Sequence, residues 1–265
     1  MTWVAWRQHR NELIIVLAIF AALAAYLVPI GLEKHDLFGD SGLRACVQAR
    51  QDCPDLRFRF LDGHNAAWNI VGWFNFVPGI VGLLLAVPIV AEFEQRTYRL
   101  AWTQGVTRSR WLAMRLSVAI GGVAIFAVLL TLLVTWSYAP FDQSVVMDGQ
   151  ELGASYDFEG AMPFSYTFFA FALALTAGAL SRRTPVAIVV GLAGFVVARL
   201  LMMELLREGI SSNVEIRLGP DDSLAELTRD MGDFWATQAQ EAAIFIGASL
   251  ILLALTAWLI QRRMA

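Results

Sequence analysis

Six long apolar stretches, separated by polar segments, dominate the pattern of the chain. Only the fifth stretch contains a charged residue, Arg199. A helix needs about 20 apolar residues to cross a hydrocarbon core about 30 Å thick, and each stretch has about that length. The pattern therefore predicts six membrane-spanning helices, at about residues 13–32, 68–91, 116–139, 161–181, 184–203 and 242–260.

Composition supports this interpretation. Of the 265 residues, 57% are hydrophobic and only 16% are charged, whereas soluble domains carry about 25% charged residues. We therefore expect an all-α, polytopic membrane protein in which residues 1–265 form a single transmembrane domain. A cleaved signal peptide is an alternative interpretation of the first stretch, but its apolar core is about twice the 7–15 residues of such peptides.

The distribution of basic residues predicts the orientation of the helices. With both termini inside, the inner segments are 1–12, 92–115, 182–183 and 261–265. These segments hold 11 of the 20 basic residues and only three of the 23 acidic ones. The outer segments, which hold the other acidic residues, are 33–67, 140–160 and 204–241. Since Arg and Lys are enriched in cytoplasmic segments, we expect both termini in the cytoplasm and the chain in the plasma membrane.

The residue types needed for catalysis within a membrane are missing from the six stretches. A P-loop needs a lysine followed by serine or threonine, so that the ammonium group reaches the phosphates. The only lysine, Lys34, is followed by His35, so the chain lacks this motif. No carboxylate falls within a predicted span, which disfavours a buried aspartyl pair or a proton-coupled carrier. We therefore expect a chain that is not an enzyme by itself and needs no cofactor of its own.

Cys46 and Cys53 both fall in the first predicted outer segment. In an oxidising compartment, we expect them to close a disulfide across that segment. Two free thiols are the simpler alternative. A metal site with His35 and His64 is a third interpretation, but the spacing lacks the usual Cys-x-x-Cys pattern, so no metal is expected.

Two polar residues in the apolar stretches admit two interpretations each. In one interpretation, Arg199 lies near the outer end of the fifth stretch, where its long stem can reach the interface beside Glu204. Alternatively, its cation lies on a substrate path or an outer gate. Asn75 in the second stretch suits an interhelical hydrogen bond as well as a ligand contact.

The segment Glu92–Trp111 is the most informative part of the chain. Gly105 divides it into two short amphipathic pieces, and Glu92, Arg96 and Arg99 share one helical face. One interpretation is a basic loop that meets anionic headgroups, at about 1 kcal/mol per arginine. The other is a helix that docks a cytosolic partner. Composition alone does not separate the two.

The order of residues in this segment resembles that in the permease subunits of ABC-2-type transporters, particularly their actinobacterial branch. The family pattern reads approximately E-x-E-x-G-T-x-R-L-A-W-T-Q-x-V-T-R-x-R-W. The matching residues are Glu92, Glu94, Thr97, Arg99 to Gln104, Val106 to Arg108, Arg110 and Trp111. One position departs from the pattern, since Arg96 stands where the family commonly has glycine.

Other segments extend the resemblance over essentially the whole chain. Trp3–Arg10 resembles the amino-terminal segment of the family, and Arg182–Pro185 resembles its short inner loop. The end of the chain resembles the last outer helix and the final span of the family, at Phe234, Trp235, Gln238, Glu241 and Trp258–Arg263.

The resemblance implies a six-helix ABC-2 fold and a transport function. Two copies, or one copy and a related permease, would pair, and each would bind a separate ATPase subunit that carries ATP and Mg. The implied ATPase-coupling residues are Glu92, Glu94, Thr97, Arg99, Trp102, Gln104, Arg108 and Arg110. The implied neighbours of the substrate pathway are Phe74, Asn75, Phe76 and Arg199.

We therefore expect the permease subunit of an ABC exporter that moves an amphipathic drug, peptide or lipid outward. A membrane sensor or assembly protein of the same fold, without net transport, is the alternative. Nothing in the sequence indicates a nucleic-acid partner.

Overall fold

The structure of the chain is a computed structural model that describes residues 2–49, 53, 55–56, 59–60, 74–97, 107–145, 156–204 and 231–263. These residues form helices and short connections, and this part of the chain contains no strand. The elements are α1 (Thr2–Asp40), α2 (Leu43–Gln48), α5 (Val77–Gln95), α7 (Arg108–Val145), the 3₁₀ turn η1 (Tyr156–Phe158), α8 (Met162–Ser181), α9 (Thr184–Met202) and α11 (Met231–Arg263). The predicted all-α fold is confirmed.

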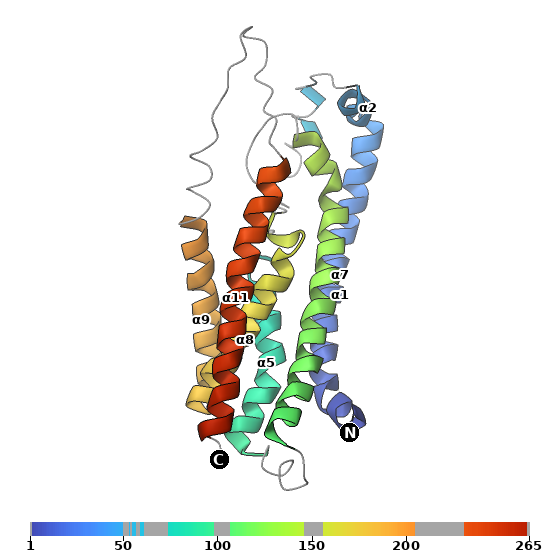
Figure 1. Ribbon diagram of the computed structural model, residues 1–265. Helices are drawn as coiled ribbons and strands as arrows, with labels where there is room; N and C mark the ends of the chain where they lie inside the picture. Colours follow the sequence, from blue (N-terminus) through green and yellow to red (C-terminus); the bar gives the residue numbers. More distant parts are fainter. Residues whose placement is uncertain are drawn as a thin grey trace.

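Six of these helices, α1, α5, α7, α8, α9 and α11, are long and apolar enough to cross a membrane. This confirms the six spans predicted from the apolar stretches. Figure 1 shows them as an elongated bundle in which both chain termini lie at the same end. That end is named the terminal end, and the other, where α2 lies, is named the distal end.

Two boundaries at the distal end differ from the prediction. The first helix does not stop at residue 32, because α1 continues to Asp40. The second span, predicted to start at residue 68, contains a turn at Asn75 and Phe76, and α5 begins only at Val77. Pro78 lies in the first turn of α5, where a missing N–H leaves no helical hydrogen bond unmade.

At the terminal end, the helices extend into the predicted inner loop 92–115. α5 continues to Gln95 and α7 begins at Arg108, so only the middle of that segment connects two helices. Thr107 caps α7, since its hydroxyl oxygen accepts a hydrogen bond from the backbone N–H of Arg110 at 3.4 Å. A threonine oxygen at this position satisfies one of the N–H groups that lack a partner in the first turn.

α8 is the centre of the bundle. Of the residues in its apolar membrane-spanning stretch, 78% are buried, compared with 22% for α9 and 28% for α11. It packs against α5, α7, α9 and α11, which surround it in Figure 1. Phe168, Phe171 and Leu175 contribute to one core cluster, and Tyr166 and Phe169 contribute to another. Protein neighbours therefore cover most of the surface of α8, whereas much of the apolar surface of α9 and α11 can face lipid.

The close approach of α5 and α8 depends on Gly82. A Cβ atom at this position would overlap the carbonyl oxygen of Thr167 and lie 2.8 Å from the backbone nitrogen of Phe171. Both obstacles are backbone atoms, which a rotamer change cannot move. Small residues allow such approach between apolar helices, where packing replaces the hydrophobic effect as the source of association.

We predict that Gly82→Ala lowers the stability of the protein by about 1–3 kcal/mol, because the added methyl group forces α5 and α8 apart. Gly121→Ala in α7 is the matched control, since a Cβ there meets no atom within 4 Å. Alanine favours a helix over glycine, so the control should be neutral or slightly stabilising. Thermal unfolding in one detergent compares the two; equal unfolding temperatures would contradict this account of the contact.

Candidate functional site

Arg199 lies buried at the distal end of α9, with only 7% of its surface exposed. Its Nη2 atom donates to Asp157 Oδ2 at 2.9 Å and to Asn75 Oδ1 at 3.4 Å. The guanidinium carbon lies 4.1 Å from the centroid of the Tyr166 ring. One cation is therefore held by a carboxylate, an amide and an aromatic face, which come from three different segments.

A second carboxylate joins this site through two tyrosines. The hydroxyl of Tyr166 donates to Glu241 Oε1 at 2.7 Å and lies 3.1 Å from Asp157 Oδ1. The hydroxyl of Tyr156 donates to Glu241 Oε2 at 3.1 Å. Tyr166 therefore stands between two carboxylates. The polar cluster consists of Asn75, Tyr156, Asp157, Tyr166, Arg199, Gln238 and Glu241.

The turn that carries Asp157 is held against α11. Gln238 Nε2 donates to the backbone oxygens of Tyr156 at 3.3 Å and Glu159 at 3.1 Å. Gly160 follows with φ +55°, and a Cβ there would overlap Gln238 Oε1. Glycine adopts this left-handed conformation without the steric cost that other residues meet. The local sequence thus fixes η1 in the position that presents Asp157 to Arg199.

The structure corrects the interpretation in which Arg199 reaches the interface beside Glu204. Arg199 is buried against Asp157, whereas Glu204 is exposed. Glu241, which the prediction places in the outer segment 204–241, lies in α11 within the apolar helix Trp235–Arg262 and is buried in the cluster. A sequence signal was available for it: Thr237, Gln238 and Glu241 recur at helical spacing and mark one polar face at the start of an apolar helix.

Of the predicted pathway residues, the structure brings only Asn75 and Arg199 together. The Phe74 ring packs edge-on against Tyr26 of α1, with centroids 5.7 Å apart. The Phe76 side chain is exposed. Asp157, Tyr166 and Glu241, which sequence reasoning did not select, complete the surroundings of Arg199.

At the terminal end, α5 is tied to two other helices. The Glu92 carboxylate forms an ion pair with Arg115 of α7. The Glu94 carboxylate accepts a hydrogen bond of 2.9 Å from the backbone N–H of Thr184, the first residue of α9. Glu92 is therefore turned inward, while Glu94 is exposed and reachable from the face of the bundle.

α5 ends at a left-handed residue. Arg96 has φ +57°, a conformation that favours glycine because other side chains meet a steric cost. This is the position at which the chain departs from the ABC-2 pattern by replacing glycine. The sharp turn is therefore present with arginine as well. Arg182, which ends α8, has the same geometry at φ +55°.

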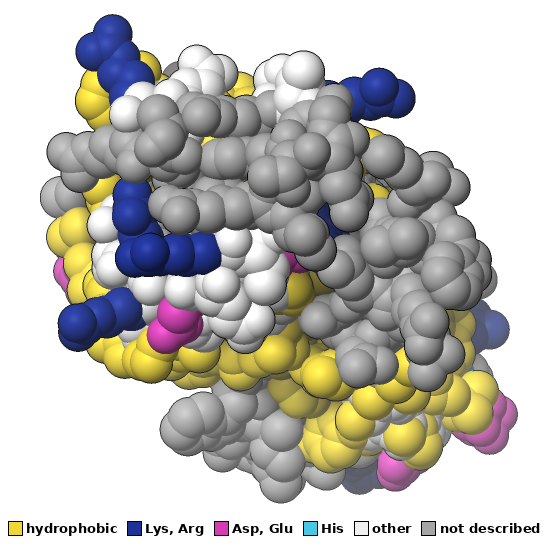
Figure 2. All heavy atoms as spheres, turned by 90° about the horizontal axis from the view of Figure 1, so that it is seen from below, with side chains coloured by type: hydrophobic (Ala, Val, Ile, Leu, Met, Phe, Trp, Pro, Cys, Tyr) yellow, Lys and Arg dark blue, Asp and Glu magenta, His cyan; other side chains and the backbone are white. Residues whose placement is uncertain are grey.

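Exposed arginines gather at the terminal end of the described helices. They are Arg96, Arg110, Arg183 and Arg262. Figure 2 views the molecule from this end and shows basic side chains around the face. Among the other predicted coupling residues, Thr97 is exposed, whereas Arg99, Trp102, Gln104 and the side chain of Arg108 lie outside the described residues.

In the structure, Cys46 is bonded to Cys53, and their Cα atoms lie 6.6 Å apart. The described residues contain no group of three or more His, Cys, Asp or Glu that could hold a metal ion. His64, named in the metal interpretation, lies outside these residues. Oxidation of the pair in the cell stays a prediction, which intact mass before and after reduction can test.

Fold and site together define a polytopic, all-helical membrane protein with a buried polar cluster at one end. A family model described as "ABC-2 membrane transporter related" matches residues 17–207. The chain belongs to this family, whose members are membrane subunits of ABC transporters. No curated protein and no solved structure matches the chain significantly. The matched range includes both the segment 92–115 and the buried pair Asp157–Arg199.

We predict that Tyr166→Phe destabilises the protein by about 1–3 kcal/mol, because the buried Glu241 carboxylate loses a hydrogen-bond donor. Tyr26→Phe is the matched control, since the Tyr26 hydroxyl makes no hydrogen bond with any described residue. Thermal unfolding of the two variants under identical conditions is the measurement. If Tyr26→Phe lowers the unfolding temperature as much as Tyr166→Phe does, the hydroxyl contacts of Tyr166 contribute nothing to stability.

Proposed function

We propose that the chain is the permease subunit of an ATP-driven ABC exporter, with both termini in the cytoplasm. Membership of the ABC-2 family supports the transport class. The concentration of arginines at the terminal end supports the orientation, because cytoplasmic segments are enriched in basic residues. A separate ATPase subunit, which carries ATP and Mg, docks at this end and supplies the energy.

The observation that carries the proposal is a pair of contacts that joins α5 to two other helices at the terminal end. The last turn of α5 contacts α7 through Glu92 and Arg115, and it contacts α9 through Glu94 and the N–H of Thr184. A partner that pushes on the segment after α5 therefore acts on three helices together. A loop that only met lipid headgroups would need its positive charge and would have no need of these acidic contacts.

The substrate is expected to pass close to α5 and α9, near Phe74, Asn75, Phe76 and Arg199. The largely apolar faces of these helices, with one buried cation, suit an amphipathic drug, peptide or lipid. A second copy of the chain, or a related permease, would complete the path. In the alternative, a sensor or assembly protein, the same docking would occur, but no substrate would be moved.

Reconstitution with the ATPase separates these functions. Stimulation of ATP hydrolysis by an amphipathic compound, together with its ATP-dependent movement across vesicles, is the result expected of an exporter. Stable docking of the ATPase with neither stimulation nor movement would favour the sensor or assembly role.

The proposed orientation predicts opposite accessibility for two exposed serines, Ser41 at the distal end and Ser109 at the terminal end. In a chain whose Cys46 and Cys53 are replaced by serine, Ser41→Cys should react with an impermeant maleimide in intact cells. Ser109→Cys should react only after permeabilisation. Labelling of Ser109→Cys in intact cells at the rate of Ser41→Cys would overturn the orientation.

Glu94 tests the coupling. Glu94→Ala removes both the negative charge and the acceptor of the Thr184 N–H, so we expect transport per ATP hydrolysed, or recovery of the co-purified ATPase, to fall about fivefold or more. Glu94→Gln keeps an acceptor oxygen for this N–H and should retain more coupling than alanine. Expression and membrane insertion of both variants should be unchanged.

The matched control for Glu94 is Asp55→Ala, which removes an exposed acidic residue at the distal end. It should leave ATPase binding and transport unchanged. If Glu94→Ala binds the ATPase and transports like the unmodified chain, the coupling role of the α5 end is wrong.

A further inference from the structure

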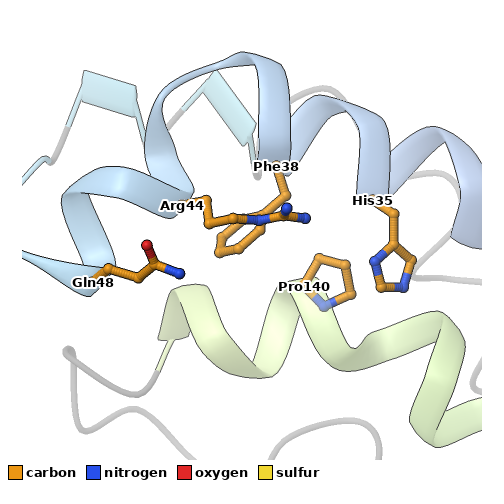
Figure 3. A pocket seen from close by; sticks show the side chains of 5 residues that line it. All are labelled: His35, Phe38, Arg44, Gln48 and Pro140. Atoms are coloured by element: carbon orange, nitrogen blue, oxygen red, sulfur yellow. The ribbon is translucent and has the colours of Figure 1, made fainter.

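A pocket of about 320 Å³ opens at the distal end, between α1, α2 and α7. Its lining residues are His35, Phe38, Arg44, Gln48 and Pro140. Figure 3 shows Arg44 and Gln48 extending from α2 into the space, with His35 and Phe38 on α1 and Pro140 on α7 around it. The pocket is separate from the polar cluster and from the terminal end, and the proposed function makes no use of it.

The pocket lies at the depth of lipid headgroups. The first span begins at Leu13, and about 20 residues at 1.5 Å each cross the 30 Å hydrocarbon core. His35 and Phe38 therefore lie roughly 4–9 Å beyond the hydrocarbon edge. Trp136 of α7 is 39% exposed and stacks on His35 with ring centroids 5.3 Å apart. An exposed tryptophan at this level is typical of the membrane–water interface.

The α2 helix holds two hydrogen-bond donors in place. Arg44 and Gln48 are four residues apart, so they share one helical face. The opposite side of α2 is anchored, because Leu43 and Cys46 are buried and Cys46 is bonded to Cys53. Neither Arg44 nor Gln48 forms a side-chain hydrogen bond with a described residue. Both groups are thus available to a ligand in the pocket.

The charge of the pocket favours an anion. None of the five lining residues is acidic, and Arg44 carries the cation, which lies over the Phe38 ring at 5.6 Å. At 100° per residue, the nearby acids Asp36 and Asp40 face away from the side of α1 that carries His35 and Phe38. The guanidinium fork and the amide of Gln48 suit the oxygens of a phosphate group.

His35 orients one wall and adds apolar surface. Its Nε2 atom lies 2.9 Å from the backbone oxygen of Trp136, an acceptor, so Nε2 carries the proton. This bond and the stacking on Trp136 hold the ring against α7. The half-buried ring, beside the buried Phe38 and Pro140, gives the pocket a small apolar lining at the level of the headgroup and glycerol regions.

We propose that this pocket binds the phosphate of a phospholipid with a net negative headgroup, with Arg44 and Gln48 as the donors. The lipid holds α2 against α1 and α7 at the membrane surface. A zwitterionic lipid offers the same phosphate, but its cationic group would meet no acid among the described lining residues. Attraction between a basic group and anionic lipids supplies the preference. The assignment holds for either orientation of the chain.

Native mass spectrometry of the purified full chain, titrated with phosphatidylglycerol, tests the site. Arg44→Ala should weaken the first bound lipid about tenfold or more, as expected on loss of a charge-assisted hydrogen bond. Arg44→Lys keeps the charge but loses the guanidinium fork, so its affinity for the lipid should lie between those of the unmodified chain and Arg44→Ala. Gln48→Ala should weaken binding severalfold. Arg59→Ala, an exposed arginine that does not line the pocket, should bind like the unmodified chain.

Two further titrations identify the ligand. Phosphatidylcholine with the same acyl chains should bind more weakly and respond less to Arg44→Ala. Inorganic phosphate at millimolar concentration should not displace phosphatidylglycerol; displacement would assign the site to a free anion and overturn the lipid proposal. Equal affinities of Arg44→Ala, Arg59→Ala and the unmodified chain would also overturn it. If Arg44→Ala fails to fold, Arg44→Lys and Gln48→Ala decide in the same way.

Discussion

The buried positive charge of Arg199 is the constraint on which the distal half of the bundle depends. An ion that loses its hydration without a partner costs several kcal/mol, so the fold has to bring partners to it. Asp157 comes from the turn before α8, Asn75 from the turn before α5, and Tyr166 from α8 itself. Glu241 of α11 joins through the tyrosine hydroxyls. The starts of three helices are thereby fixed around the end of a fourth.

The same pair of helices, α5 and α9, is tied at both ends. At the terminal end, Glu94 in the last turn of α5 accepts a hydrogen bond from the first residue of α9. At the distal end, Asn75 before α5 accepts from Arg199 in the last turn of α9. In the proposed function, these contacts couple the two antiparallel helices, so that a displacement near Glu94 would be carried to the buried cation.

The sequence predicts best the features that depend on the length and apolarity of a segment. It predicts least well the features that depend on the burial of a polar group. The six spans follow from the dimensions of a bilayer. Asp157 and Glu241 fall in the predicted outer segments. Only the fold shows that Asp157 pairs with Arg199 and that Glu241 joins the polar cluster through the hydroxyls of Tyr156 and Tyr166. The extension of α1 past residue 32 was missed for a similar reason. Polar side chains in this extension carry no burial cost, because the helix has left the hydrocarbon core. Its backbone groups stay hydrogen-bonded within the helix, so the helix can continue. Arg96 is a different case. It stands where the resembled family pattern has glycine, and its backbone is nevertheless left-handed.

The ion pair between Arg199 and Asp157 can be tested directly by a double-mutant cycle of Arg199→Gln and Asp157→Asn, read as thermal unfolding of the purified chain. Each single variant leaves one buried charge without its partner, whereas the double variant leaves neither. The account predicts that the double variant is more stable than the sum of the single effects by about 1–3 kcal/mol. Simple additivity of the two substitutions would contradict the claim that this pair organises the distal end.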